Sequence, residues 1–248
     1  MEVGFKTDKG LRRSNNEDAC YVLLKEKVFI VADGVGGNNS GEIASRTCVD
    51  EIANHVESFD LTTLDDEEAI EDFFAQCIKD VNFKVLELSQ RHEENWGMAT
   101  TVVVAYLKGN QLYVFNVGDS RAYILHDGHM LQITEDHTYV NSLVKAGVIS
   151  LEEAEYHENR HMITRAVGAD YQIETDAFVV TVEEGDRILL CTDGLYGEVP
   201  LEVLIETLSG DSSMPAICEQ FVDLAKEYGG NDNITMVVVN VTEDDINE

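Results

Sequence analysis

The hydrophobic pattern divides the chain into short β-branched runs and longer segments in which apolar residues recur with helical spacing. Two short apolar runs near the start predict a pair of strands, at 20–24 and 28–32. The spacing that follows predicts two long helices, over 40–59 and 66–92. The chain therefore opens with strands and then covers them with helices.

A block of strands comes next. The run at 100–107 is apolar throughout and rich in β-branched residues, which predicts a central strand buried on both faces. Strands at 112–117 and 121–125 continue from it, with tight turns at 109–110 and 127–128. We interpret this block as an antiparallel meander.

Residues 136–165 interrupt the pattern, because they are polar and contain two short helical patterns, at 139–146 and 151–157. We interpret them as an excursion from the core. The later apolar runs predict two strands, two helices and a last buried strand, at 173–182, 186–192, 200–208, 214–228 and 235–241.

This order keeps strands and helices in separate blocks, which is typical of the α+β class. Two mainly antiparallel sheets packed together, each covered by a helix pair, would form a four-layer α-β-β-α sandwich. No linker rich in Pro, Ser or Gly divides the sequence, so we expect a single domain over 1–248 with the excursion at 136–165 as a flap.

The charge balance is strongly acidic, with 48 Asp and Glu against 17 Lys and Arg and a formal net charge of -31. Nucleic acid and anionic membranes would be repelled, which excludes both as partners. The acidic runs at 65–68 and 242–245 are predicted to be solvated surface.

The five cysteines are scattered, odd in number and without a C-x-x-C pair, which argues against a disulfide framework and against structural zinc. The first residues show no secretion signal, and no apolar run approaches 18 residues. We expect a cytoplasmic protein without membrane insertion, most simply a monomer.

Candidate chemistry appears where two apolar strands end in Asp-Gly, at Asp33-Gly34 and Asp193-Gly194. Asp119 and Asp232 also stand at strand edges beside Gly or Asn, and Asp18 precedes the first strand. One Asp-Gly alone is most simply a turn. Several carboxylates at strand ends across the whole chain, without His or Cys beside them, favour a hard divalent ion, Mg²⁺ or Mn²⁺.

The same segments carry a family resemblance that runs from near residue 5 to residue 241. They are 13–18 (RSNNED), 31–37 (VADGVGG), 97–101 (GMATT), 116–121 (NVGDSR), 190–195 (LCTDGL) and 231–235 (NDNIT). In this order they resemble the type 2C (PPM family) metal-dependent serine/threonine protein phosphatases, of the compact bacterial type. The resemblance implies a β-sandwich with a binuclear Mn²⁺ or Mg²⁺ centre at one end.

The resemblance also implies a role for each matching residue. Asp33 would bridge two ions, and the Gly34 carbonyl would bind one of them. Asp18, Asp193 and Asp232 would complete the ligands, and Asp119 with Asp193 would hold a possible third ion. Arg13 would grip the substrate phosphate. Glu17 and Asn233 would support the ligands, Glu17 by holding a bound water or else as a surface acid, and Asn233 by orienting Asp232.

The implied reaction is direct attack on phosphorus by a water or hydroxide that bridges the ions, without a covalent phosphoenzyme. The substrates would be phosphoserine and phosphothreonine in proteins, and the enzyme would oppose a bacterial serine/threonine kinase. Many eukaryotic members of the family have a His directly after the first Asp-Gly, proposed as general acid, but here the residue is Val35. A metal-bound water, His137 or His161 could take that role, so the general acid stays unassigned.

Two other function classes remain open at this point. One is a binding or regulatory member that has kept the fold but lost catalysis, although the ligands are intact at every matched position. The other is an acidic Ca²⁺-binding protein, which the absence of a contiguous ligand loop argues against.

Overall fold

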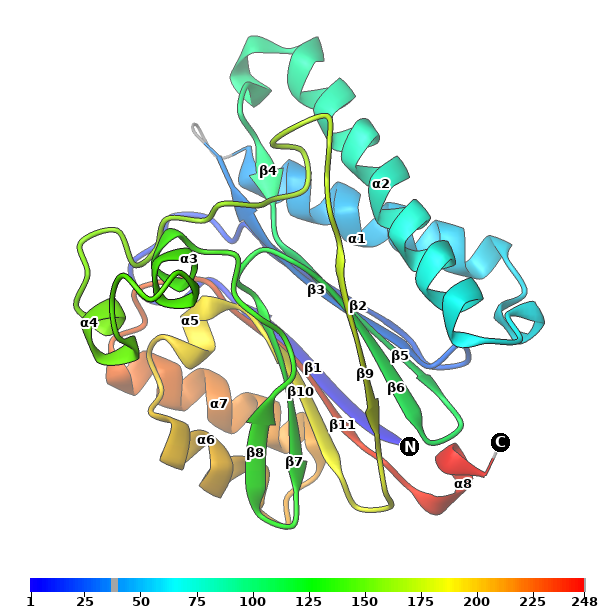
Figure 1. The fold of residues 1–248 in the computed structure, drawn as a ribbon. Helices are drawn as coiled ribbons and strands as arrows, with labels where there is room; N and C mark the ends of the chain where they lie inside the picture. Colours follow the sequence, from blue (N-terminus) through cyan, green and yellow to red (C-terminus); the bar gives the residue numbers. More distant parts are fainter. Residues whose placement is uncertain (37–39, 248) are drawn as a thin grey trace.

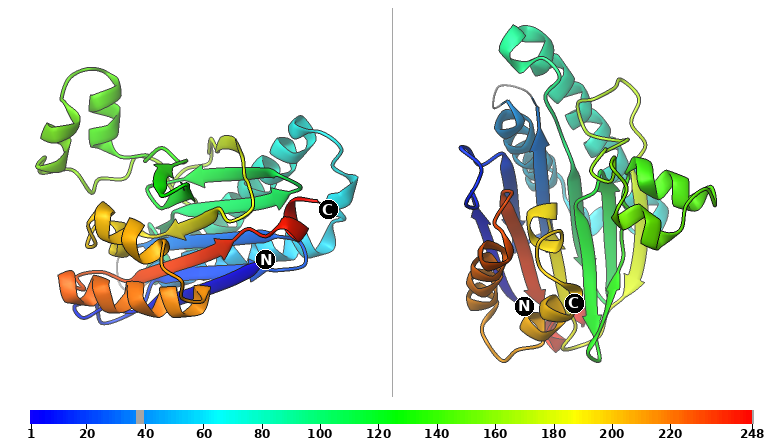
Figure 2. Two further views of the ribbon diagram at one scale, coloured as in Figure 1. Left: turned by 90° about the horizontal axis from the view of Figure 1, so that it is seen from below. Right: turned by 90° about the vertical axis from the view of Figure 1, so that its left-hand side faces the viewer.

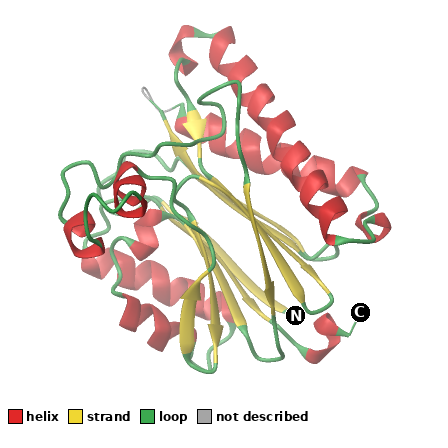
Figure 3. Ribbon diagram, in the orientation of Figure 1, coloured by secondary structure: helices red, strands yellow, loops and turns green. Residues whose placement is uncertain are grey.

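The computed structural model describes residues 1–36 and 40–247, and Gly37 of the 31–37 motif lies outside them. Its strands form two sheets in which every pairing is antiparallel (Figures 1 and 3). The first sheet has the order β1 (Glu2–Asp8), β11 (Ile234–Asn240), β10 (Arg187–Cys191), β7 (Arg121–His126) and β8 (His129–Gln132). The second has the order β2 (Asp18–Leu23), β3 (Val28–Val35), β5 (Val102–Lys108), β6 (Gln111–Val117) and β9 (Asp176–Thr181), with β4 (Ala99–Thr100) beside β3.

Helices cover the outer face of each sheet (Figures 1 and 3). The second sheet is covered by α1 (Gly41–Ser58) and α2 (Glu67–Arg91), and the first by α6 (Leu201–Leu208) and α7 (Met214–Tyr228). Shorter elements are η1 (Leu61–Thr63), η2 (Glu93–Asn95), α3 (Tyr139–Lys145), α4 (Leu151–Glu155), α5 (Asp193–Tyr196) and α8 (Glu243–Ile246). This is the predicted α+β sandwich of four layers. No helix in the described part of the chain combines the length and apolar character needed to cross a bilayer.

The central strands carry apolar residues on both faces, as predicted for 100–107. In β5, Val102, Val104 and Tyr106 pack under α1 and α2. Val103, Ala105 and Leu107 face the other sheet. Because successive side chains point to opposite faces, each central strand contributes to an outer core and to the core between the sheets.

Two strand predictions were wrong. The segments 112–117 and 121–125 do not continue one meander, because β6 lies in the second sheet and β7 in the first. The chain crosses between the sheets at 118–120, where Gly118 has φ +109° and a Cβ would lie 2.6 Å from the Thr101 side chain.

The edge strands β1 and β8 were missed, since each exposes much of its length and has a weak apolar pattern. Phe5 in β1 is 59% exposed and Leu131 in β8 is 60% exposed.

The acidic segment at 242–245 is not simply solvated, which corrects that prediction. Asp245 is buried, accepts hydrogen bonds from the Thr242 hydroxyl at 2.6 Å and backbone N–H at 2.9 Å, and pairs with the Met1 ammonium at 2.9 Å. Asp245 therefore caps α8 and joins it to the start of β1, so the two ends of the described chain lie close together (Figure 1).

The predicted excursion projects from one end of the sandwich and carries α3 and α4 (Figure 2). Its two ends are tied to each other through an isolated bridge between Thr138 and Ile163. The excursion is anchored on the core by His137, whose backbone N–H donates to the Gly118 carbonyl at 3.0 Å. The flap therefore begins beside the crossing point between the sheets.

One surface pair makes stability depend on pH. The His126 Nδ1 lies 2.7 Å from Oδ1 of the buried Asp186, and this hydrogen bond raises the pKa of His126 above its usual value. A histidine with a raised folded-state pKa stabilises below its unfolded pKa, and that contribution is lost as the pH rises through the folded value. We expect His126→Gln to lower the melting temperature more at pH 5.5 than at pH 8.5. His129→Gln, on the same hairpin, is the matched control, and an equal effect of His126→Gln at both pH values would contradict the prediction.

Candidate metal centre

The predicted aspartates gather at one end of the sandwich because of strand register. Asp18, at the start of β2, is the direct cross-strand partner of Asp33 near the end of β3. In the other sheet, Cys191 at the end of β10 faces Met236 of β11 and Arg121 of β7. That register places Asp193, Asp232 and Asp119 just beyond the same end of the first sheet. This is also the end that carries the flap (Figure 1).

Asp33 and Gly34 lie inside β3, which continues to Val35 rather than stopping before them as predicted. The Asp33 backbone N–H donates to the Thr101 hydroxyl at 2.9 Å, and its carbonyl accepts from the Thr101 N–H at 2.9 Å. A Cβ on Gly34 would lie 2.2 Å from the Gly41 carbonyl oxygen and 2.5 Å from that of Glu17. Glycine is therefore required here for close backbone approach, and Asp33 is held rigidly on both sides.

Asp193 opens α5, a short helix that the sequence analysis did not predict. A Cβ on Gly194 would lie 1.8 Å from the Asn233 carbonyl oxygen. Glycine is therefore required at this position too, because it lets the start of α5 lie against the segment that holds Asp232. Thr192, also missed, donates its hydroxyl hydrogen bond to Asp18 Oδ2 at 2.8 Å. Its position directly before Asp193 was the available signal.

Arg13 lies at the edge of this group, with its side chain 53% exposed. Its guanidinium Nη2 donates to Asp232 Oδ2 at 2.6 Å. A half-exposed cation at the edge of a group of carboxylates is placed to meet an anion that arrives from solvent.

Asn233 supports the site differently from the prediction. Its backbone N–H donates to Asp232 Oδ1 at 2.7 Å, but its side chain reaches the neighbouring loop. The amide oxygen accepts from the Glu17 backbone N–H at 2.7 Å, and the amide nitrogen donates to the Lys9 and Asn15 carbonyls at 3.0 and 2.9 Å. Asn233 therefore fixes the segment that carries Arg13, Glu17 and Asp18.

The carboxyl groups are close enough to raise one another's pKa values. Burial, followed by the charges of neighbouring aspartates, raises the pKa of Asp33 well above its usual range. Burial and nearby carboxylates also raise the pKa to about 7 for Asp18 and Asp119 and to about 6 for Asp193. Burial raises the pKa of Glu17 as well. Repulsion among buried carboxylates of this kind is removed when a divalent cation binds them.

Unsatisfied oxygens show that the side chains fit a metal ion. Asp18 Oδ1 and Asp193 Oδ1 are both buried and have no hydrogen-bond partner in the described structure. Leaving a buried carboxylate oxygen unpaired is costly, whereas an ion would satisfy both. Within residues 1–36 and 40–247, no three Asp, Glu, His or Cys side chains alone enclose an ion. The donors that the aspartates offer are carboxylate oxygens, which suit hard ions such as Mg²⁺ or Mn²⁺.

The two histidines considered as general acid occupy different surroundings. His137 is buried; its Nδ1 accepts from the Gly118 backbone N–H at 3.0 Å, and its Nε2 lies 3.2 Å from Asp176 Oδ2. These contacts give His137 a structural role at the base of the flap. His161 is exposed on the flap, between α4 and β9. The general acid remains unassigned.

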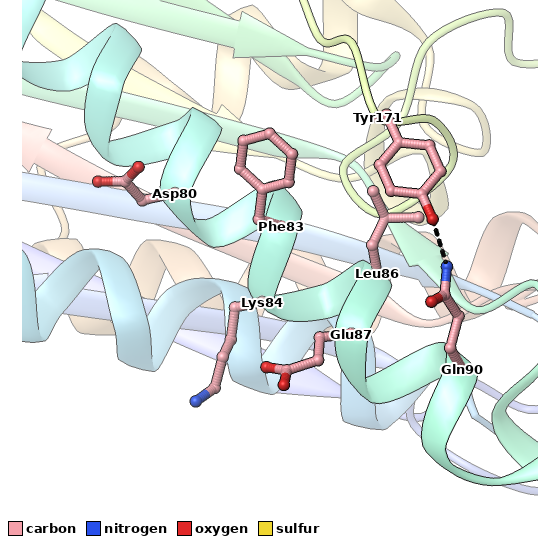
Figure 4. A pocket seen from close by; sticks show the side chains of 7 residues that line it. All are labelled: Asp80, Phe83, Lys84, Leu86, Glu87, Gln90 and Tyr171. Carbon is pink, nitrogen blue, oxygen red and sulfur yellow. Dashed lines mark hydrogen bonds between the residues drawn. The ribbon is translucent and has the colours of Figure 1, made fainter.

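A separate hollow of about 470 Å³ lies on the outer face of α2 (Figure 4). Leu86 and Gln90 of that helix lie beside Tyr171, whose hydroxyl accepts from the Gln90 amide at 3.0 Å. None of the candidate ligands lines this hollow. The hollow is therefore separate from the carboxylates at the end of the sandwich.

Comparison with known proteins decides the family. Residues 11–237 match the family described as Protein phosphatase 2C. The chain belongs to the protein phosphatase 2C family. Family membership makes it an enzyme, a protein phosphatase, and the resemblance found in the sequence is confirmed.

Individual relatives agree with this assignment. The chain is 36% identical over 242 residues to the serine/threonine phosphatase Stp of Listeria innocua, covering 96% of this chain and 95% of that protein. It superposes on the crystal structure of serine/threonine phosphatase Stp1 from Staphylococcus aureus with a TM-score of 0.90, at 33% identity over 97% of this chain and 95% of the other.

A third relative of this protein phosphatase 2C chain has been solved with metal. The catalytic domain of the serine/threonine protein phosphatase PstP, in complex with two manganese ions, superposes with a TM-score of 0.85 at 32% identity, over 97% of this chain and 98% of that one. The predicted fold is confirmed by these structures. Since the family is one of enzymes, the two other function classes considered from the sequence, a member without catalysis and an acidic Ca²⁺-binding protein, are no longer favoured.

Proposed function

We propose that this chain hydrolyses phosphoserine and phosphothreonine in proteins, using two Mn²⁺ or Mg²⁺ ions and no covalent phosphoenzyme. It is a protein serine/threonine phosphatase by family and by its relatives. The observation that carries the metal-dependent mechanism is the pair of buried, unpartnered oxygens on Asp18 and Asp193. They stand beside Asp33, whose backbone is fixed by Thr101.

The ligand set that we propose follows the predicted roles. Asp33 would be shared by the two ions, the Gly34 carbonyl would bind one of them, and Asp18, Asp193 and Asp232 would complete the set, in part through water. Asp119 and Asp193 would hold a third ion. The ions, when bound, lower the pKa of water so that hydroxide is available near neutral pH and offset charge on the phosphate oxygens.

The protein's own residues position the reactants. Thr101 and the close contact at Gly34 fix Asp33, while Thr192 orients Asp18. Arg13, already within reach of Asp232, exchanges this carboxylate for two phosphate oxygens of the substrate. Glu17 lies close enough to Arg13 for the positive charge of Arg13 to oppose the rise in the pKa of Glu17. It is placed to hold a bound water.

Arg13→Ala is expected to lower kcat/KM for a phosphothreonine peptide by about 10- to 100-fold, since a charge-assisted hydrogen bond contributes about 1.5–3 kcal/mol. Steady-state kinetics with saturating Mn²⁺ measure the effect. Arg12→Ala removes the neighbouring exposed cation and is the matched control, expected to change kcat/KM less than threefold. Equal losses in both variants would assign Arg13 to general attraction rather than to the phosphate.

A rapid-quench experiment tests the reaction itself. Phosphoserine and phosphothreonine peptides carrying ³²P are expected to release phosphate in the presence of Mn²⁺ without leaving label on the protein. A phosphotyrosine peptide serves as the comparison substrate. Label that remains on the quenched protein and decays at the rate of turnover would contradict direct attack.

The cellular setting of this activity is also part of the proposal. By family analogy, the enzyme opposes a bacterial serine/threonine kinase and its phosphoprotein substrates. All five cysteines are unpaired thiols, which suits a reducing cytoplasm. One chain supplies every proposed ligand from a single domain over 1–248, so we propose that it acts as a monomer.

A further inference from the structure

The loop at 118–120 is tied to three different parts of the molecule. His137 at the base of the flap exchanges two hydrogen bonds with Gly118, each 3.0 Å long. The Ser120 hydroxyl lies 2.6 Å from that of Thr101, which also holds the Asp33 backbone. Between them, the carbonyl of Asp119 accepts a 2.7 Å hydrogen bond from the Tyr196 hydroxyl.

Tyr196 joins the elements that carry the two carboxylates. It is the last residue of α5, the helix that begins at Asp193. Its hydroxyl is bonded to the backbone of Asp119, and the carboxyl of Asp119 lies near enough to Asp193 for their charges to interact. Rotation or sliding of α5 would therefore move Asp193 and the Asp119 loop together.

The ring of Tyr196 is itself fixed in place. The Arg121 guanidinium carbon lies 3.7 Å from the ring centroid, a cation–π contact. Arg121 is anchored in turn by Asp136, whose two carboxylate oxygens accept from its Nε and Nη2 at 2.6 to 3.1 Å. Because hydrogen bonds to both oxygens of Asp136 fix the planar guanidinium over the ring, the phenol has little freedom to move. Its hydroxyl therefore stays directed at Asp119.

We propose that Tyr196 is a positioning residue that sets the spacing of Asp119 and Asp193, and so the affinity of the further divalent ion that they hold. This inference rests on the proposed function, because it takes the two aspartates as ligands. In this role Tyr196 is not itself a ligand. It acts on the site only through the backbone of Asp119 and through α5.

Mn²⁺ titration calorimetry of the metal-free protein tests the proposal. Tyr196→Phe keeps the ring under Arg121 but removes the hydroxyl, and we expect the weakest class of Mn²⁺ sites to lose about three- to tenfold in affinity. The tighter sites, which also have Asp18, Asp33 and Asp232 as ligands, should lose less affinity than the weakest class, whereas a purely structural defect would weaken all classes equally. Tyr123→Phe is the matched control, because the Tyr123 hydroxyl accepts from Arg121 Nη1 at 3.0 Å and is not bonded to Asp119.

The outcomes separate this inference from the proposed function. If Asp119→Ala removes the weak class and Tyr196→Phe leaves it unchanged, the positioning role is wrong and the metal-dependent function stands. If the wild-type protein binds no Mn²⁺ at all, both fail. If wild type binds Mn²⁺ with no weak class, the positioning role alone is overturned.

A second measurement needs no variant and remains decisive if Tyr196→Phe does not fold. Hydrogen–deuterium exchange of the wild-type protein is followed as Mn²⁺ is raised through the weak class. Because Tyr196 links the two elements, amides at 118–120 and 193–197 should gain protection at the same Mn²⁺ concentration. Protection of one segment without the other would overturn the proposal.

Discussion

Asp33→Asn is expected to lower turnover of a phosphothreonine peptide by about 10²- to 10³-fold while making the metal-free protein more stable. Activity falls because the amide cannot bridge two cations as a carboxylate does. Stability rises because the burial of Asp33 itself, followed by the charges of the neighbouring aspartates, raises its pKa well above the usual range, so its ionised form is costly in the metal-free fold. A neutral amide of the same shape removes that repulsion.

The expected gain in the unfolding free energy of the metal-free variant at pH 8 is about 1–3 kcal/mol. Urea unfolding in EDTA measures it, alongside steady-state turnover in Mn²⁺. Asp223→Asn, at an exposed position on α7, is the matched control and should change neither quantity. A variant at Asp33 that loses both activity and stability would instead assign the residue to the core of the fold.

Mn²⁺ is expected to stabilise the wild-type protein strongly, and more so at pH 7.5 than at pH 6. One ion at about 100 times its Kd adds roughly 2.7 kcal/mol to the unfolding free energy, and two ions add more. For a chain of this size, that corresponds to a rise in melting temperature of roughly 5–10 °C per ion.

The pH dependence follows from the raised carboxyl pKa values. The pKa is raised from 3.8 to about 7 for Asp18 and Asp119, and to about 6 for Asp193. The folded metal-free protein therefore holds protons that the unfolded chain has lost, and its stability falls as the pH rises from about 4 to about 7. Mn²⁺ must displace these protons, so it binds more tightly above that window. Melting curves in EDTA and in Mn²⁺ at the two pH values measure this, and a Mn²⁺ shift that does not grow with pH would contradict it.

The hydrophobic pattern was sufficient to locate the strands whose side chains are buried on both faces of a sheet. β5 and β11 are apolar and β-branched along their length, so pattern alone located them within two residues. The edge strands β1 and β8 were missed because one face of each meets solvent. β1 lies against α7 at Gly4, where a Cβ would be 2.3 Å from Met214 backbone atoms. The spacing of apolar residues along the sequence cannot predict a contact of this kind.

Sheet membership was not predictable, because β6 and β7 are separated by only three residues yet lie in different sheets. The crossing depends on how Gly118 packs against Thr101, which is a property of the folded molecule. The aspartates themselves were predictable, since their chemistry is local. Their supports, Thr101, Thr192 and Tyr196, belong to segments that meet only after folding. Thr101 and Thr192 lie inside two of the motifs and Tyr196 directly follows one, and this was the signal that the sequence offered.

The most direct test of the account is the turnover of a phosphothreonine peptide by wild-type protein stripped with EDTA, followed as Mn²⁺ is returned. We expect no measurable hydrolysis in EDTA and recovery that tracks the binding of two ions per chain. Asp18→Asn and Asp193→Asn should shift that recovery to higher Mn²⁺ concentrations. Full activity in EDTA, or recovery that neither substitution changes, would contradict the proposal that these buried carboxylates hold the catalytic metal.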